Sequence, residues 1–111
     1  MRMSISILND LKVMENLQKA YNGAKDRDVD EASKIFFSYY DLDYEKIEKL
    51  PHDLKVSLDT LQKQGYLNHN HRNLFINNIR ISKYIITLTT EGERYFSNKF
   101  SNILTSLINK I

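Results

Sequence analysis

Apolar residues recur at helical spacing along the first half of the chain and predict helices there. A first helix, over residues 5–22, has an apolar face at steps of three and four and closes at Asn22-Gly23. A second, over residues 30–40, has a clean apolar face and a candidate N-cap at Asp30. A further helix carries Leu54, Leu58 and Leu61 on one face. It stops at Gly65, since glycine adopts the left-handed conformation beyond a helix without a steric penalty.

A short helix is predicted between these last two. Asp43 is its candidate cap, and Ile47 and Leu50 face inward over residues 44–50. Pro51 ends it and suits the first turn of the next helix, where a missing N–H costs nothing. A short helix, a tight turn and a longer helix form a helix-turn-helix. We therefore expect residues 30–64 to be a helical core that contains a helix-turn-helix.

After Gly65 the pattern changes to that of β-strands. Residues 74–76 and 84–88 are apolar and β-prone, residues 79–82 alternate, and Asn77-Asn78 is typical of a turn. We expect two or three strands that form a hairpin over residues 66–88. Thr90 and Glu93 have capping-box spacing, so a final helix is expected over residues 90–111, with an apolar stripe that continues to the terminus.

These elements define an α+β fold, mainly α, and the length of 111 residues suits a single domain over residues 1–111. There is no cysteine, so disulfides and thiolate metal sites are excluded. No apolar run approaches the roughly 20 residues that span a bilayer, and the first residues lack the features of a signal peptide. We expect a cytoplasmic protein without membrane contact. Abundant Asn, Ile and Lys suggest AT-rich codons and thus a low-GC bacterium or its mobile elements.

The local pattern LxxLxxxGYL, followed by LTxEGxxYF, starts at Leu58 and ends at Phe96. It resembles the second half of a winged helix-turn-helix domain, and the chain is similar to the YjcQ-like phage proteins and to several short winged-helix regulators. The resemblance covers residues 42–100. It implies a winged helix-turn-helix with an extra N-terminal helix, a β-hairpin wing and a long C-terminal helix. The helix at residues 29–40 departs from the usual pattern, and is either an insertion or the true second helix of the fold.

The resemblance also implies that the chain binds duplex DNA, through the helix at residues 52–64 and the wing at residues 68–83. The net charge of +2 is only weakly informative, but between Gly65 and Thr90 the charged residues are all basic. Asp59, in contrast, would repel phosphate. The predicted DNA-binding residues are His52, Val56, Thr60, Lys63, Asn70, His71, Arg72, Asn78, Arg80 and Lys83.

The first and last helices are expected to form a homodimer surface. The apolar stripe of the last helix is longer than a domain of this size needs to cover its core, and a second copy of the chain is the simplest partner for its outer half. The predicted dimerisation residues are Leu11, Leu17, Phe100, Ile103, Leu104, Leu107, Ile108 and Ile111.

The expected role is a small transcriptional regulator or a DNA-binding accessory of a mobile genetic element. One alternative is a single-stranded-DNA-binding replication accessory, in which aromatic residues stack on bases. These residues are Tyr39, Tyr40, Tyr44, Tyr66, Phe75 and Tyr84. Another alternative is a winged-helix protein-interaction module without DNA binding, which the acids between Asp41 and Asp59 favour.

Candidate chemistry beyond binding is sparse. His69 and His71 share one face of a strand, and His52 lies elsewhere, but a metal site would need further ligands. No nucleophile–base pair, carboxylate pair or Gly-rich phosphate loop stands out. We expect no enzyme activity, no metal and no cofactor.

Overall fold

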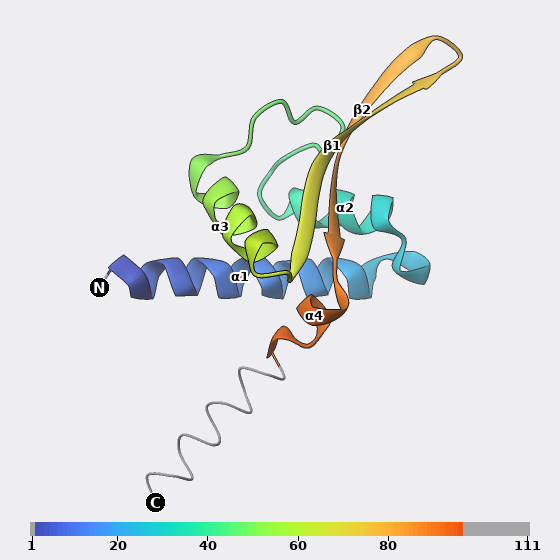
Figure 1. The fold of residues 1–111 in the computed structure, drawn as a ribbon. Helices are drawn as coiled ribbons and strands as arrows, with labels where there is room; N and C mark the ends of the chain where they lie inside the picture. The colour runs from blue at the N-terminus through green and yellow to red at the C-terminus, as the bar shows by residue number, and fades with distance from the viewer. Residues whose placement is uncertain (1, 97–111) are drawn as a thin grey trace, which may run out of the picture.

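The computed structural model describes residues 2–96 and shows an α+β fold (Figure 1). The chain forms helix α1 (Arg2–Gly23), a 3₁₀ turn (Lys25–Arg27), helix α2 (Val29–Ser38) and helix α3 (His52–Lys63). Strands β1 (Leu67–Ile76) and β2 (Ile79–Leu88) follow, and then the short helix α4 (Thr90–Glu93). Helix α4 begins at the residue predicted for the C-terminal helix but ends at Glu93, and residues 97–111 lie outside the described part of the chain.

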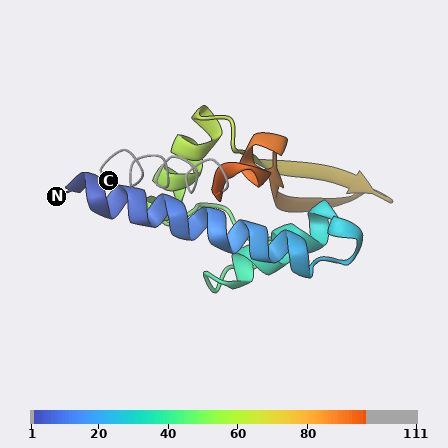
Figure 2. The same cartoon turned by 90° about the horizontal axis from the view of Figure 1, so that it is seen from below.

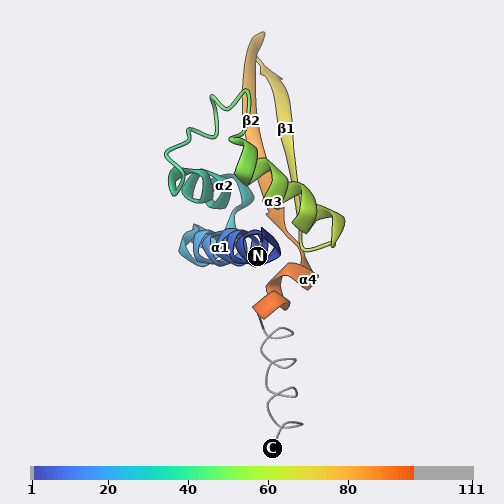
Figure 3. The same ribbon diagram turned by 90° about the vertical axis from the view of Figure 1, so that its left-hand side faces the viewer.

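Helix α1 lies along α2, α3 and the inner end of the hairpin (Figure 2). Helix α2 packs against β2, and α3 packs against β1 (Figure 3). Phe36 and Phe37 of α2 are fully buried and meet edge to face, with ring centroids 5.2 Å apart. Helix α2 therefore contributes directly to the core.

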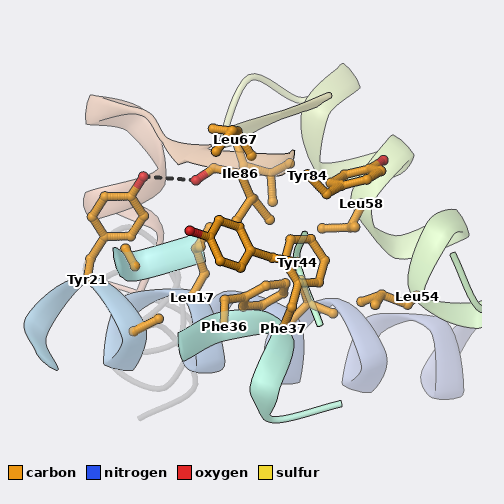
Figure 4. Close-up of a cluster of buried hydrophobic side chains, with 14 of the residues drawn as sticks. Leu17, Tyr21, Phe36, Phe37, Tyr44, Leu54, Leu58, Leu67, Tyr84 and Ile86 are labelled. Carbon is orange, nitrogen blue, oxygen red and sulfur yellow. Dashed lines mark hydrogen bonds between the residues drawn. The ribbon is translucent and has the colours of Figure 1, made fainter. Parts of the chain in front are cut away.

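The core gathers side chains from every major element (Figure 4). Leu17 comes from α1, Leu58 from α3, and Leu67 and Ile86 from the two strands, all of them fully buried. The apolar face predicted for α3, with Leu54, Leu58 and Leu61, is confirmed by their burial. Burying a leucine or isoleucine side chain stabilises a fold by about 1.5–3 kcal/mol, so this cluster is the main source of stability.

The prediction of a short helix over residues 44–50 is wrong. The segment 39–51 consists of turns, in which the Asp43 side chain accepts a hydrogen bond from the N–H of Glu45 (3.0 Å). The backbone N–H of Tyr84 donates to the carbonyl of Tyr44 (2.7 Å), so this segment is also bonded to the hairpin. A helix this short has little intrinsic stability, and Pro51 disfavours helical geometry at the residue before it.

Two predicted caps are displaced along the chain. Helix α2 is capped by Asp28, whose carboxylate accepts from the N–H of Glu31 (3.0 Å), rather than by Asp30. Helix α4 is capped by Thr89, whose hydroxyl accepts from the N–H of Gly92 (3.0 Å), rather than by Thr90. In both cases the capping residue is the one with extended backbone geometry, which an N-cap requires.

The hairpin is a regular antiparallel ladder from Leu67↔Leu88 to Ile76↔Ile79. Its turn, Asn77-Asn78, has positive φ at both residues (52° and 65°), the geometry that matches the twist of a two-residue hairpin. The turn prediction is therefore confirmed, and the polar residues 68–73 belong to the strand itself. Near the base of the hairpin, side chains of α2 and α1 form hydrogen bonds with the backbone of β2. The Ser33 hydroxyl accepts from the N–H of Ile86 (3.0 Å), and the Tyr21 hydroxyl donates to the carbonyl of Ile86 (2.9 Å).

Candidate nucleic-acid interface

The outer half of the hairpin projects beyond the helices (Figures 1 and 3). We call residues 72–83 the arm. All of residues 70–80 are exposed, whereas Tyr84, Ile85 and Ile86 at the base are buried. The arm therefore belongs to the sheet but not to the core, and it is the part of the described chain that extends furthest from the packed body.

The register divides the side chains of the arm between two faces, because successive residues of a strand point to opposite sides. One face joins the cross-strand pairs Arg72↔Lys83, Leu74↔Ile81 and Ile76↔Ile79. We call it the apolar face: four aliphatic side chains lie towards the turn, and two cations lie at the inner end. The other, polar face joins Asn73↔Ser82 and Phe75↔Arg80.

Arg72 and Arg80 are exposed, while Lys83 is half-buried. The guanidinium of Arg80 donates to the side-chain oxygen of Asn73 (3.3 Å) on the same face. The ammonium of Lys83 lies 5.7 Å from the centre of the Tyr44 ring, a cation–π distance. Arg72 and Arg80 are thus the cations most open to a partner, and Lys83 supports them from the base of the arm.

A groove of about 710 Å³ lies between the arm and the segment 39–51. Arg80 and Asn73 line it from the arm, and Glu45, Lys46 and Glu48 line it from the other side. Acids and cations are thus mixed along the groove. The apolar face of the arm, in contrast, carries two cations, Arg72 and Lys83, at its inner end.

The predicted contacts on α3 are only partly available. His52, Val56 and Lys63 are exposed as expected, and Val56 is 48% exposed. Thr60 is half-buried, and its hydroxyl donates to the carbonyl of Val56 (2.8 Å), so this donor is already used within the helix. The outer face of α3 thus offers few hydrogen-bond donors.

Asp59 of α3 is not an isolated acid. Its carboxylate lies 2.8 Å from Nε2 of His69 on β1, and Nδ1 of His69 lies 2.5 Å from the hydroxyl of Tyr84 on β2. Burial and then the charge of Asp59 raise the pKa of Tyr84 to about 12. The phenol of Tyr84 can donate to or accept from Nδ1 of His69, and Nε2–H of His69 can donate to the carboxylate of Asp59. The backbone N–H of His69 also donates to the side chain of Gln62 (2.9 Å), so α3 is bonded to β1 at this one residue.

His71 is less available than predicted. Its Nε2 contacts the backbone carbonyl of Ile47, and its ring packs edge-on against Tyr84 with centroids 4.6 Å apart. The residue is exposed overall, but only its other ring nitrogen is left for a partner such as DNA. Asn70 and Asn78, in contrast, are exposed on β1 and in the turn.

The dimerisation prediction is wrong for Leu17, which is fully buried in the core of its own chain. Leu11 is half-buried and packs against the core. The remaining residues predicted for this surface, Phe100, Ile103, Leu104, Leu107, Ile108 and Ile111, lie outside the described residues.

The aromatic residues proposed for base stacking do not form a platform. Tyr44 and Tyr84 are buried, and Tyr40 and Tyr66 are half-buried. Tyr39 and Phe75 are exposed, the first at the end of α2 and the second near the tip of the arm. Of the six residues, Tyr39 and Phe75 are thus the ones exposed enough to stack on bases.

The sequence reasoning missed the apolar face of the arm. Its signal was present: Leu74 and Ile76 alternate before the two-residue turn, and Ile79 and Ile81 alternate after it, which places all four on one side of a hairpin. It also missed the bridge from Asp59 through His69 to Tyr84, which unites residues far apart in the sequence.

Within residues 2–96, no helix is both long and apolar enough to cross a bilayer. In the same range, no cluster of His, Asp and Glu side chains has the arrangement of a metal site. The chain matches no protein-family model, no curated protein and no solved structure. A functional assignment therefore depends on the geometry of α3 and the arm.

Proposed function

We propose that this chain is a winged-helix protein that binds duplex DNA, with the arm as its wing. The observation that carries the proposal is a projecting hairpin whose charged residues are all basic, Arg72, Arg80 and Lys83, with no acid between Gly65 and Thr90. The order of the elements, three helices followed by a hairpin, is that expected of a winged helix and supports the same assignment.

In this proposal the arm fixes the protein on the phosphate backbone, and α3 approaches a groove with His52, Val56 and Lys63. Phosphate contacts position a protein without reading sequence, so the cations of the arm supply affinity and salt dependence. The role remains that of a small regulator or a DNA-binding accessory of a mobile element, acting as a homodimer in the cytoplasm. The dimer would place two arms about one helical turn of DNA apart.

Fluorescence anisotropy with a labelled AT-rich duplex, and with its separate strand, tests the proposal across a salt series. Each phosphate contact contributes about −0.9 to the slope of log K against log salt. Replacing Arg72, Arg80 and Lys83 together with alanine should therefore flatten the slope by roughly 2 to 3 and weaken binding. Circular dichroism should show an intact fold, since the arm lies outside the core.

A matched control variant removes three positive charges from the helices instead of the arm. Lys12, Lys19 and Lys34 are exposed on α1 and α2, and their replacement with alanine should leave the slope unchanged. Equal effects of the two triple variants would show that only net charge matters and would refute the arm as the contact surface. The absence of duplex binding by the wild-type chain at low salt would refute the proposal itself.

One specific observation favours a second candidate, a protein-interaction module. Leu74, Ile76 and Ile79 are 40%, 52% and 65% exposed on one face of the arm, and such contiguous apolar surface often marks a protein contact. Under this alternative neither duplex nor single strand would bind above background, and a pull-down through the arm would be the next experiment.

A further inference from the structure

The tip of the arm is apolar, although it lies in the most exposed part of the hairpin. Phe75, Ile76 and Ile79 flank the Asn77-Asn78 turn and are 74%, 52% and 65% exposed. They are not part of the core, which ends at the base of the hairpin with Tyr84. Their side chains therefore contribute little to folding, and an apolar function at the tip is the simpler explanation for them.

A regular hairpin ladder and a two-residue turn hold the tip. The ladder runs without interruption to the pair Ile76↔Ile79, and both turn residues have the positive φ of a two-residue hairpin turn. Ile76 and Ile79 lie side by side on the apolar face, and Phe75 lies on the opposite face. Ile76 and Ile79 therefore form an apolar wedge at the end of a two-stranded ribbon, and Phe75 extends the apolar surface of the tip on its other face.

The charge behind the tip selects the kind of partner. Arg72 and Lys83 form the cross-strand pair four residues behind Ile76↔Ile79, on the same face, and Arg80 pairs with Phe75. At about 3.3 Å per residue, the Arg72↔Lys83 pair lies roughly 13 Å behind the tip. The minor groove of DNA is about 6 Å wide and about 7.5 Å deep, so a two-stranded ribbon can reach its floor only where the duplex is kinked and the groove is widened. In that geometry, long cationic side chains at this distance from the tip can reach phosphates at the rim. This complementarity favours a polyanion with apolar faces inside it, which stacked bases provide.

We propose that the tip enters the minor groove and inserts Ile76 and Ile79, which lie on one face, at a base step, so that the duplex is unstacked and kinked. This inference rests on the proposed function and specifies how the arm engages duplex DNA. Insertion of Phe, Leu or Ile between base pairs kinks DNA by about 20–90°, and the cost of unstacking is a few kcal/mol per step. The arm would thereby favour duplexes that are already weakened at one step.

The test compares matched and single-mismatch duplexes, using the wild-type chain first. Energy transfer between end labels should report bending, and a fluorescent adenine analogue next to the mismatch should brighten as it unstacks. Since a factor of ten in affinity corresponds to about 1.4 kcal/mol, and a mismatch removes part of the unstacking cost, the wild-type chain should prefer the mismatched duplex by about tenfold.

The variant Phe75→Thr/Ile76→Thr/Ile79→Thr keeps residues with β-propensity while it removes the wedge. It should lose the bend and the mismatch preference but keep the salt slope, which depends on Arg72, Arg80 and Lys83. Leu8→Thr is the control, because Leu8 is 63% exposed on α1, away from the arm. It should behave as the wild-type chain does.

Several results would overturn the inference, and they are distinguishable. Salt-dependent duplex binding by the wild-type chain without bending or mismatch preference would reject the wedge and leave the proposed function standing. No duplex binding at all would reject both. Loss of self-association in the threonine variant, seen by analytical ultracentrifugation, would assign the tip to a second copy of the chain. Tip-dependent binding to anionic phosphatidylserine vesicles, without DNA bending, would assign it to a lipid surface.

Discussion

Gly92 lies where the start of α4 meets the turn before β1, and it has no room for a side chain. A Cβ built on Gly92 would lie 2.0 Å from the carbonyl oxygen of Tyr66 and 2.6 Å from Cδ1 of Leu88. The leucine methyl can rotate away, but the carbonyl is backbone and accepts a hydrogen bond from the N–H of Thr89 (3.2 Å). Gly92→Ala should therefore displace the connection between the α3–β1 turn and α4.

The expected loss of stability is about 2–3 kcal/mol. Overpacking a tight site costs about 1–3 kcal/mol, and disturbing the Thr89–Tyr66 hydrogen bond adds about 1 kcal/mol. The better helix propensity of alanine offsets up to about 1 kcal/mol of this. Since a domain of this size is stable by only about 5–15 kcal/mol, the change is large and should lower Tm by roughly 10 °C.

Urea unfolding followed by far-UV circular dichroism measures this effect, with Gly23→Ala as the matched control. Gly23 ends α1, and its added Cβ would meet only Cδ1 of Ile35 at 3.9 Å, an ordinary contact. The control should be neutral or slightly stabilising. If Gly92→Ala costs no more than Gly23→Ala, the close approach between Gly92 and the Tyr66 carbonyl is refuted.

Two further predictions concern the hairpin base. Because burial and Asp59 raise the pKa of Tyr84 to about 12, above the usual value near 10, the folded chain holds this proton longer than the unfolded chain. Stability should therefore fall as pH rises from about 10 to about 12, by up to about 2 kcal/mol, and Tyr84→Phe should show a smaller fall in urea unfolding across that range. Ser33→Ala should cost about 1–3 kcal/mol, because it leaves the buried N–H of Ile86 without its acceptor. The exposed Ser38→Ala is its control, and an equal cost for both would count against the Ser33 bond.

The sequence predicted the positions of α1, α2 and α3 well, because each depends on a local pattern. Their apolar faces repeat at helical spacing, and Gly65 ends α3 with a φ of +86° as a C-terminal glycine should. The hairpin turn at Asn77-Asn78 was also predictable, since asparagine tolerates positive φ. Caps were less certain, because Asp28 and Asp30 are equally suitable as residues and only the backbone geometry selects between them.

The failures share a physical cause, which is contact between distant parts of the chain. Residues 44–50 have the inward apolar positions of a short helix, but Tyr44 bonds instead to Tyr84, forty residues further on. Leu17 has the same helical periodicity as a dimer contact would have, yet it is fully buried in the core of its own chain, in the same cluster as Phe36 and Ile86. Local spacing indicates which side of a helix is apolar, but it does not indicate what covers that side.

The bridge at His69 changes how the charge of α3 should be understood. As a free acid on the outer face, Asp59 would simply oppose DNA. Bonded to His69, and through it to Tyr84, it holds α3 against both strands of the hairpin. These hydrogen bonds, together with the packing of α3 against β1, hold α3 beside the base of the hairpin, while the arm continues outward. Under the proposed function, a duplex that contacts α3 and the tip together would have to match this arrangement.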